Sequence, residues 1–336
     1  MADIEVERSG GVARVVLNRP DALNALTLDM CLALDASLRE WQDAPGVDAV
    51  LVRGQGSRAF CAGGDIRRLY EERGGDYPRE FYRAEYRLNA RLHRFSKPYI
   101  AFLDGIVMGG GVGVSVHGSH RIATEHTQFA MPETGIGLFP DVGGSYFLSR
   151  CPGSLGMYLG LTGTRLAAAD AIYCGIAQYA APAESWAGLS GASSVARVAQ
   201  PPAPPPLAGH RALIDRCFGK DTVEEIAAAL EAEQDRFAAE TLAVLGAKSP
   251  TSLKITHRQI RSGRALDFDG CMRMEWRMVN RVIAGHDFYE GTRAAIIDKD
   301  RKPRWQPARL AAVTESEVAR YFAPLPGDEL HFDWER

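Results

Sequence analysis

The sequence lacks the residue patterns of a metal-binding, disulfide-stabilised or membrane-spanning protein. Its six cysteines stand singly, with no CxxC pair, which argues against a zinc ribbon or a disulfide framework and fits a reducing compartment. The histidines show no metal-ligand spacing, so we expect no bound metal. The most apolar run, residues 98–116, contains Asp104 and five glycines. It predicts buried strand and turn rather than a membrane span.

An excess of charge of one sign is also missing. The 336 residues carry a net charge of -3, with 46% apolar and 24% charged residues, as is usual for a globular protein. This balance gives no reason to expect a nucleic acid or an anionic membrane as partner. The acidic N-terminus has no apolar stretch, so we expect neither a signal nor a transit peptide, and we expect a cytoplasmic protein.

The first half of the chain alternates between strand and helix patterns. Gly10-Gly11 separates two alternating segments, which predicts a hairpin. Strands that alternate with helices of this length predict an α/β core with parallel strands, and the hairpin makes the sheet mixed. The predicted elements are strands at 3–8, 12–17, 49–52 and 99–103 and helices at 28–41, capped by Thr27, and 79–95.

The second half differs in composition. Six of the 18 prolines fall between residues 182 and 206, which predicts a loop or semi-rigid spacer over 181–210. We therefore divide the chain into an α/β core (1–180), this Ala/Pro-rich spacer (181–210) and a helical C-terminal region (211–336).

Three helices are expected in the C-terminal region. Thr222 and Glu225 form a capping box for a helix that runs to about Leu245. Ser249-Pro250 starts the next helix, with proline at its first position. The third covers residues 266–284, and its apolar stripe predicts core or subunit interface; the stripe consists of Phe268, Met272, Trp276, Val279 and Ile283.

Two glycine-rich segments are candidates for ligand binding. One is Cys61-Ala62-Gly63-Gly64-Asp65-Ile66, and the other is Met108-Gly109-Gly110-Gly111-Val112-Gly113, which follows a strand. Glycine lets a backbone approach a ligand closely, and two converging amides would form an oxyanion hole. Neither segment fits the common phosphate-binding motifs. Tight packing of strand on helix remains an alternative explanation for each segment.

A third segment, residues 131–144, supplies ionisable groups. Glu133 and Asp141 lie eight residues apart in a stretch rich in glycine, proline and apolar residues. Partial desolvation would favour their neutral forms and suit them to acid–base catalysis, although each could simply cap a turn. Cys61 has no histidine near it in sequence, so we expect a packing residue rather than a nucleophile.

Together these segments resemble the crotonase (enoyl-CoA hydratase/isomerase) superfamily and, within it, the 3-hydroxyisobutyryl-CoA hydrolase branch. The similarity covers nearly the whole chain. The residues that carry it are Asn18-Arg19-Pro20, Ala22 to Leu26, Ala59 to Ile66, Lys97 to Ala101, the triple glycine, Met131 to Gly144, Ser249 to Lys254, Gly285 to Gly291 and Asp298-Lys299-Asp300.

The resemblance implies a crotonase-like spiral of ββα units followed by a C-terminal helical region. It also implies that the amides of Gly64 and Gly110 bind the thioester carbonyl oxygen, and that Asp65 and Ile66 contact the acyl-CoA. Coenzyme A belongs to the substrate, so no separate cofactor is expected. A homo-oligomer, a trimer or hexamer, is expected as in other members of the superfamily.

One departure from the hydratases indicates the reaction. The hydratases of the superfamily that this sequence resembles have a catalytic glutamate where this sequence has Gly113. Glycine cannot help to activate water for addition to a double bond. The second hydratase glutamate matches Glu133, and Asp141 is typical of the hydrolase branch. Glu85, which the sequence alone predicts to be solvated, matches a substrate-contacting glutamate of that branch.

The sequence therefore predicts hydrolysis of a 3-hydroxyacyl-CoA, with 3-hydroxyisobutyryl-CoA giving 3-hydroxyisobutyrate and CoA, as in valine catabolism. Glu133 and Asp141 are the expected catalytic pair, and Glu85 would help to hold the acyl end. Two alternatives remain open: a hydratase, isomerase or other crotonase-type enzyme, and an acyl-CoA-binding protein without turnover.

Overall fold

The chain begins with the predicted hairpin. In the computed structural model, which describes residues 3–335, β1 (Ile4–Ser9) pairs antiparallel with β2 (Val12–Leu17) across the turn at Gly10 and Gly11. Both turn glycines have positive φ, at 58° and 79°, which side chains other than glycine rarely adopt. Thr27 accepts a hydrogen bond from the amide of Met30 and caps α1 (Leu28–Asp43), as predicted.

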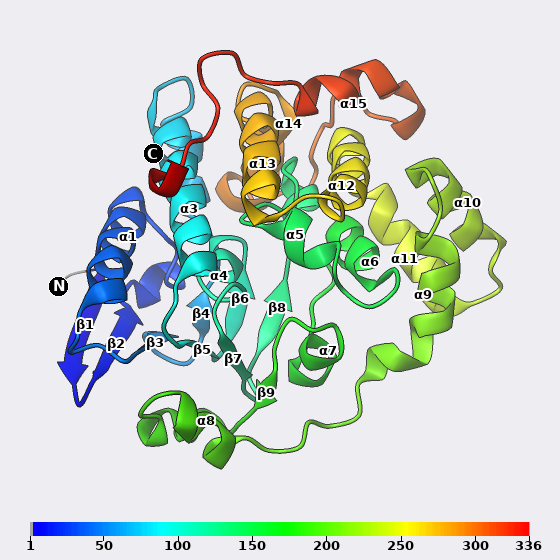
Figure 1. Ribbon diagram of the computed structural model, residues 1–336. Helices are drawn as coiled ribbons and strands as arrows, with labels where there is room; N and C mark the ends of the chain where they lie inside the picture. The colour runs from blue at the N-terminus through cyan, green and yellow to red at the C-terminus, as the bar shows by residue number, and fades with distance from the viewer. Residues whose placement is uncertain (1–2, 336) are drawn as a thin grey trace. The chain divides into compact units, whose positions relative to one another are not determined.

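The following strands alternate between two sheets. A mixed six-stranded sheet has the order β1-β2-β3-β5-β7-β9, in which only the β1–β2 pair is antiparallel, and a parallel three-stranded sheet has the order β4-β6-β8 (Figure 1). Each turn of the chain from β3 to β8 thus gives one strand to each sheet, which confirms the predicted spiral. The strands are β3 (Ala49–Gly54), β4 (Ala59–Cys61), β5 (Tyr99–Leu103), β6 (Ile106–Met108), β7 (His120–Ala123), β8 (Gln128–Ala130) and β9 (Tyr179–Ala180).

Two compact units are formed from discontinuous parts of the chain. The first comprises residues 1–65, 84–130 and 165–208, and the second comprises 66–83, 131–164 and 209–336. All strands of both sheets belong to the first unit. The remaining elements of residues 20–173 are η1 (Pro20–Ala22), α2 (Ile66–Glu71), α3 (Tyr77–Arg94), α4 (Gly110–Gly113), η2 (Glu133–Ile136), α5 (Gly144–Leu148), α6 (Leu155–Thr162) and α7 (Ala168–Tyr173).

The Ala/Pro-rich segment is more ordered than a solvated spacer. It contains η3 (Ala183–Gly188), α8 (Ala192–Val198) and η4 (Pro206–His210). Leu189 and Val195 are 0% and 1% exposed and join the apolar cluster on the six-stranded sheet, where Trp186 also packs. Because these few apolar side chains have a sheet face to cover, the segment folds despite its composition.

The C-terminal helices follow the predicted caps, with one correction. The helix capped by Thr222 does not reach Leu245. It ends as α10 (Val223–Ala232), and a second helix, α11, follows. Asp235 accepts hydrogen bonds from the amides of Phe237 and Ala238 and starts the new helix. The elements of this region are α9 (Arg211–Phe218), α10, α11 (Arg236–Gly246), α12 (Pro250–Gly263), α13 (Phe268–Val282), α14 (Asp287–Thr292), η5 (Arg293–Ile297), η6 (Leu310–Ala312), α15 (Glu315–Phe322) and η7 (Asp333–Glu335).

Candidate active site

The two glycine-rich segments converge in the first unit. They follow β4 and β6, which are neighbours in the three-stranded parallel sheet, so both segments leave the sheet at the same edge. A methyl group built on Gly110 would lie 3.3 Å from the amide nitrogen of Gly64. The amides of these two residues are therefore brought close together, as an oxyanion hole requires.

Neighbouring backbone groups hold Gly64 in place. The amide of Leu26 donates to Gly63 O at 2.8 Å, and the amide of Asp65 donates to Leu26 O at 2.9 Å. Among the turn, loop and cap hydrogen bonds of residues 3–335, none has the amide of Gly64 or of Gly110 as donor. Both amides are thus left to bind an acceptor, and Gly110 is also the first residue of α4, where the helix dipole is positive.

Two predicted substrate contacts flank this pair of amides. Glu85 on α3 is 2% exposed, and a methyl group on Gly110 would overlap its Oε1 atom. The burial of Glu85 contradicts the expectation from sequence alone of a solvated helix residue. Asp65 Oδ2 forms an ion pair with Arg19 Nη2 at 3.0 Å. This contact ties the Asn18-Arg19-Pro20 motif to the first glycine segment.

Cys61 packs in the core of the same unit. Its side chain is 0% exposed, and a methyl group on Gly111 would collide with its backbone carbonyl. Burial raises the pKa of its thiol to about 12, so the nucleophilic thiolate is disfavoured. These observations agree with the prediction of a packing residue, and the close approach explains why glycine occupies position 111.

The second unit carries Glu133 on a tight turn. Glu133 begins the 3-10 helix η2, and Gly137 ends it with φ at 75° and an amide that donates to Glu133 O. The turn is attached to the helical region, since the amide of Ser249 donates to Thr134 O at 3.1 Å. Gly137 also lies so close to the backbone of Asp287 that a side chain there would collide with it. Local geometry and packing therefore both require glycine at position 137.

Glu133 is a buried acid whose proton is held more tightly than usual. The residue is 4% exposed, and its Oε2 atom has no hydrogen-bond partner among the described residues. Burial raises its pKa well above the ordinary value, and the charge of Asp141 raises it further. The ammonium group of Lys248 acts in the opposite direction and lowers the pKa of Glu133. The carboxyl group is thus suited to proton transfer.

Asp141 lies in a loop that is attached to two helices. It is 3% exposed, and its carbonyl accepts from the amide of Gly144 at 2.7 Å. On one side of it, Gln259 Nε2 on α12 donates to Pro140 O at 2.7 Å. On the other side, the carboxylate of Glu275 on α13 accepts from the amide of Gly143 at 2.8 Å. The predicted residues thus form two groups, with Gly64, Gly110, Glu85 and Asp65 in the first unit and Ile66, Glu133 and Asp141 in the second.

Comparison with known proteins then assigns the family. The model of the enoyl-CoA hydratase/isomerase family matches residues 12–322. The chain belongs to that family. The match covers both units, and the resemblance noted in the sequence motifs is confirmed.

Individual members carry different activity names. The chain is 42% identical to the mitochondrial 3-hydroxyisobutyryl-CoA hydrolase of Danio rerio, over 98% of this chain and 91% of the relative. Among solved structures, a carnitinyl-CoA dehydratase from Mycobacterium thermoresistibile matches with a TM-score of 0.94 and 41% identity, covering 98% of this chain and 99% of that one. An enoyl-CoA hydratase from Rhodobacter sphaeroides 2.4.1 gives 0.92 and 42%, covering 98% and 100%.

Lys248 and Glu275 were not singled out in the sequence. Lys248 precedes the predicted cap Ser249, and its Nζ atom would lie 3.4 Å from a methyl group on Gly135. Glu275 is spaced seven residues after Phe268 and four before Val279, so it belongs to the apolar stripe of its helix. A carboxylate on a buried helix face indicates a polar partner in the core, and this signal would have identified Glu275.

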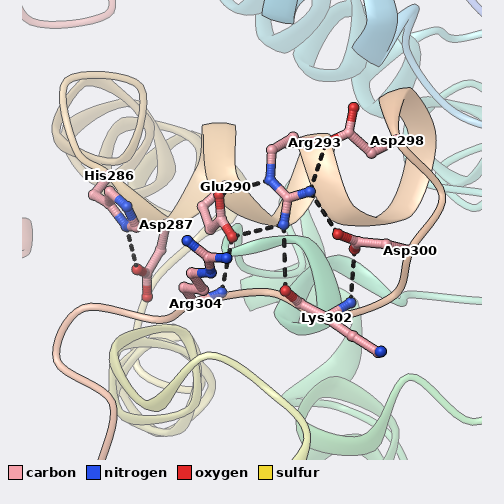
Figure 2. A network of polar contacts seen from close by, with 8 residues as sticks. All are labelled: His286, Asp287, Glu290, Arg293, Asp298, Asp300, Lys302 and Arg304. Atoms are coloured by element: carbon pink, nitrogen blue, oxygen red, sulfur yellow. Dashed lines mark hydrogen bonds and ion pairs between the residues drawn. The ribbon is translucent and has the colours of Figure 1, made fainter.

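The last family motifs form a polar network around Arg293 (Figure 2). The guanidinium group donates to Glu290 at 2.9 and 3.0 Å, to Asp298 at 2.6 Å and to Asp300 at 2.8 Å. These contacts join α14 to the stretch that follows η5. The same end of the chain supports Glu133, because Gly291 of α14 lies directly against the backbone of Ile136 in η2.

Residues 3–335 contain neither a candidate metal site nor a membrane-spanning helix. No group of three or more histidine, cysteine, aspartate or glutamate side chains could hold a metal ion. Within the same residues, no helix has both the length and the apolar character needed to cross a bilayer.

Proposed function

We propose that this chain hydrolyses a 3-hydroxyacyl-CoA thioester and that 3-hydroxyisobutyryl-CoA is its preferred substrate. The observation that carries the proposal is a pair of buried carboxyl groups in the second unit, Glu133 at 4% and Asp141 at 3% exposed, with the charge of Asp141 raising the pKa of Glu133. The glycine at the position where hydratases have a catalytic glutamate, Gly113, supports it, because water addition then lacks one of its two carboxylates. The name of the Danio rerio relative agrees with this reaction.

In the proposed reaction, the amides of Gly64 and Gly110 donate hydrogen bonds to the thioester oxygen as the carbonyl carbon becomes tetrahedral. Ionised Glu133 either attacks that carbon to give an anhydride or removes a proton from the attacking water. Collapse of the tetrahedral species breaks the C–S bond, and the thiolate leaves with the electron pair. Asp141 orients water or the substrate hydroxyl, or passes a proton to the thiolate. In the anhydride route, water then releases the acid and regenerates Glu133.

The substrate contacts follow from the same reaction. Glu85 lies against Gly110 and would hold the polar acyl end, while Asp65 and Ile66 would contact the acyl-CoA. No cofactor is needed, since the leaving group is CoA itself. We also propose a homo-oligomer, on the basis of the family, and a cytoplasmic location, although the Danio rerio relative is described as mitochondrial.

A thioester panel tests this function. Release of free thiol is measured with 3-hydroxyisobutyryl-, 3-hydroxypropionyl- and crotonyl-CoA, and we expect the first to give the highest kcat/KM. Glu133→Gln and Asp141→Asn should each lower turnover by roughly 100-fold or more, as for loss of a positioned acid or base. Near-normal thiol release by both folded variants would remove these residues from the mechanism.

A hydratase or dehydratase is the second candidate. The descriptions of the two solved structures, which match at 41% and 42% identity, favour it. Loss of the enoyl absorbance of crotonyl-CoA without thiol release would support this candidate. Binding of CoA without turnover of any thioester would instead support a non-catalytic acyl-CoA-binding protein.

A further inference from the structure

The loop that carries Asp141 is held in an unfavourable backbone conformation. Val142 has φ at 50° and Gly143 has φ at 87°. A β-branched residue such as valine is rarely found in this left-handed region, where its side chain crowds the backbone. Such a conformation persists only where surrounding contacts enforce it. The contacts around residues 140–145 therefore determine where the Asp141 side chain lies.

Glu275 supplies three hydrogen bonds to residues on the C-terminal side of Asp141. Its Oε2 atom accepts from the amide of Gly143 at 2.8 Å, and its Oε1 atom accepts from the amide of Ser145 at 2.9 Å. The hydroxyl of Ser145 makes a further short hydrogen bond to Oε1. One carboxylate thus binds the backbone two and four residues after Asp141, and both bonds lie within the second unit.

The placement of Glu275 is unfavourable for stability alone. The residue is 0% exposed and sits in the apolar stripe of α13 between Met274 and Trp276. Burial raises its pKa to about 8, and the nearby Asp141 adds to this effect. Burying a polar group costs free energy unless hydrogen bonds compensate for its lost solvation.

We propose that Glu275 is a positioning residue for thioester hydrolysis, which fixes the Asp141 carboxylate by holding the backbone of residues 142–145, where the loop enters α5. The inference rests on the proposed function, because it requires that Asp141 takes part in the reaction. The hydrogen bonds of Glu275 described above go to Gly143 and Ser145. Glu275 is therefore expected to act on catalysis through Asp141 and to leave binding of the CoA portion unchanged.

A graded pair of substitutions tests the inference. Glu275→Met keeps an unbranched side chain but removes both acceptors, and we expect kcat to fall by roughly 100-fold with little change in KM, since small misplacements have such effects. Glu275→Gln retains one carbonyl oxygen and should restore part of the lost kcat. The matched control is Asp269→Asn on the same helix, whose carboxylate accepts from Trp334 Nε1 at 3.0 Å instead of from the loop. Its kcat should be unchanged.

A double-mutant cycle separates positioning from general destabilisation. Thiol release from 3-hydroxyisobutyryl-CoA is measured for Asp141→Asn with and without Glu275→Gln, after thermal unfolding has shown that each variant is folded. If Glu275 acts through Asp141, its substitution adds less than about 3-fold once Asp141 is already changed, because residues that act as a unit are not additive. Independent, multiplicative losses would overturn the inference.

The outcomes also distinguish failure of the inference from failure of the proposed function. If Asp141→Asn lowers kcat strongly but folded Glu275→Gln and Glu275→Met retain normal kcat, Glu275 has no positioning role and the proposed function stands. If Asp141→Asn retains normal kcat, both the role of Asp141 and the inference are wrong. If Glu275→Met does not fold, Glu275→Gln alone decides, and an unchanged kcat contradicts the inference.

Discussion

Gly110 is the residue at which a single added methyl group should disturb the proposed oxyanion hole. That methyl group would overlap Glu85 Oε1 and lie 3.1 Å from Leu26 Cδ1 and 3.3 Å from the Gly64 amide. We predict that Gly110→Ala lowers kcat/KM for thiol release by roughly 100- to 1,000-fold, as for loss of an oxyanion-hole donor.

Gly46→Ala is the matched control for this substitution. It lies in the same unit, and no atom lies within 4 Å of a methyl group built there. Its kcat/KM should equal that of the unmodified protein. If Gly110→Ala is folded and as active as Gly46→Ala, the two glycine segments do not form the oxyanion hole.

Lys248 should set the pH at which Glu133 becomes active. Its positive charge lowers the pKa of Glu133, which burial and Asp141 raise. Lys248→Met keeps the aliphatic stem and removes the charge, so the pKa of Glu133 should rise. Since the ionised form attacks or acts as base, the acidic limb of the kcat/KM profile should move to higher pH. A limb that stays in place would show that Glu133 ionisation does not control the reaction.

At the scale of single elements, the caps predicted in the sequence were the most reliable guides. Thr27, Thr222 and Ser249 start helices as expected, because each side-chain oxygen needs only an amide two or three residues away. Asp235 is also a helix cap, although we predicted one uninterrupted helix there. It starts α11, so the predicted helix is two helices in the structure. The order of the Ala/Pro-rich segment could not be predicted, since it depends on packing against distant strands.

Helix α14 packs against η2, which carries Glu133. A methyl group on Gly291 would collide with the backbone of Ile136, so Gly291→Ala must displace α14 from η2. We expect a loss of about 1–3 kcal/mol in the free energy of unfolding, as for other overpacked sites, together with a lower kcat. Denaturant unfolding and thiol release measure the two effects.

Gly246→Ala serves as the control for that substitution. Gly246 ends α11, and no atom lies within 4 Å of a methyl group built there. Alanine at this position should leave unfolding unchanged or raise its free energy by up to about 1 kcal/mol, because it restricts the unfolded chain. Equal stability of the two alanine variants would mean that α14 is free to shift without cost.

For the molecule as a whole, the candidate catalytic residues could be predicted from the sequence, but the residues that hold them in position could not. Glu133, Asp141 and the glycine segments lie in short motifs whose composition marks them. Glu275 binds a loop more than 100 residues earlier, with separations of 132 and 130. A pairing over that distance arises from tertiary packing, which no local pattern encodes. The burial of Glu85 was missed for the same reason.

Global stability should depend on pH through Glu275. Burial raises its folded pKa to about 8 from an ordinary value of 4.5, so between these values the folded protein holds a proton that the unfolded chain has lost. Stability should therefore decrease as pH rises through this window, by on the order of 1 kcal/mol per pH unit at most. Glu275→Gln cannot ionise and should show a shallower decrease in urea unfolding. Parallel curves for the two proteins would contradict the assigned burial.

Hydrolysis and hydration by this protein can be distinguished in one experiment. A single preparation of the full chain is given 3-hydroxyisobutyryl-CoA, with thiol release followed, and crotonyl-CoA, with loss of the enoyl absorbance followed. We predict a kcat/KM for thiol release at least roughly 100-fold above that for hydration, because Gly113 removes one hydratase carboxylate while Glu133 and Asp141 remain. Efficient hydration of crotonyl-CoA with little thiol release from either substrate would contradict it.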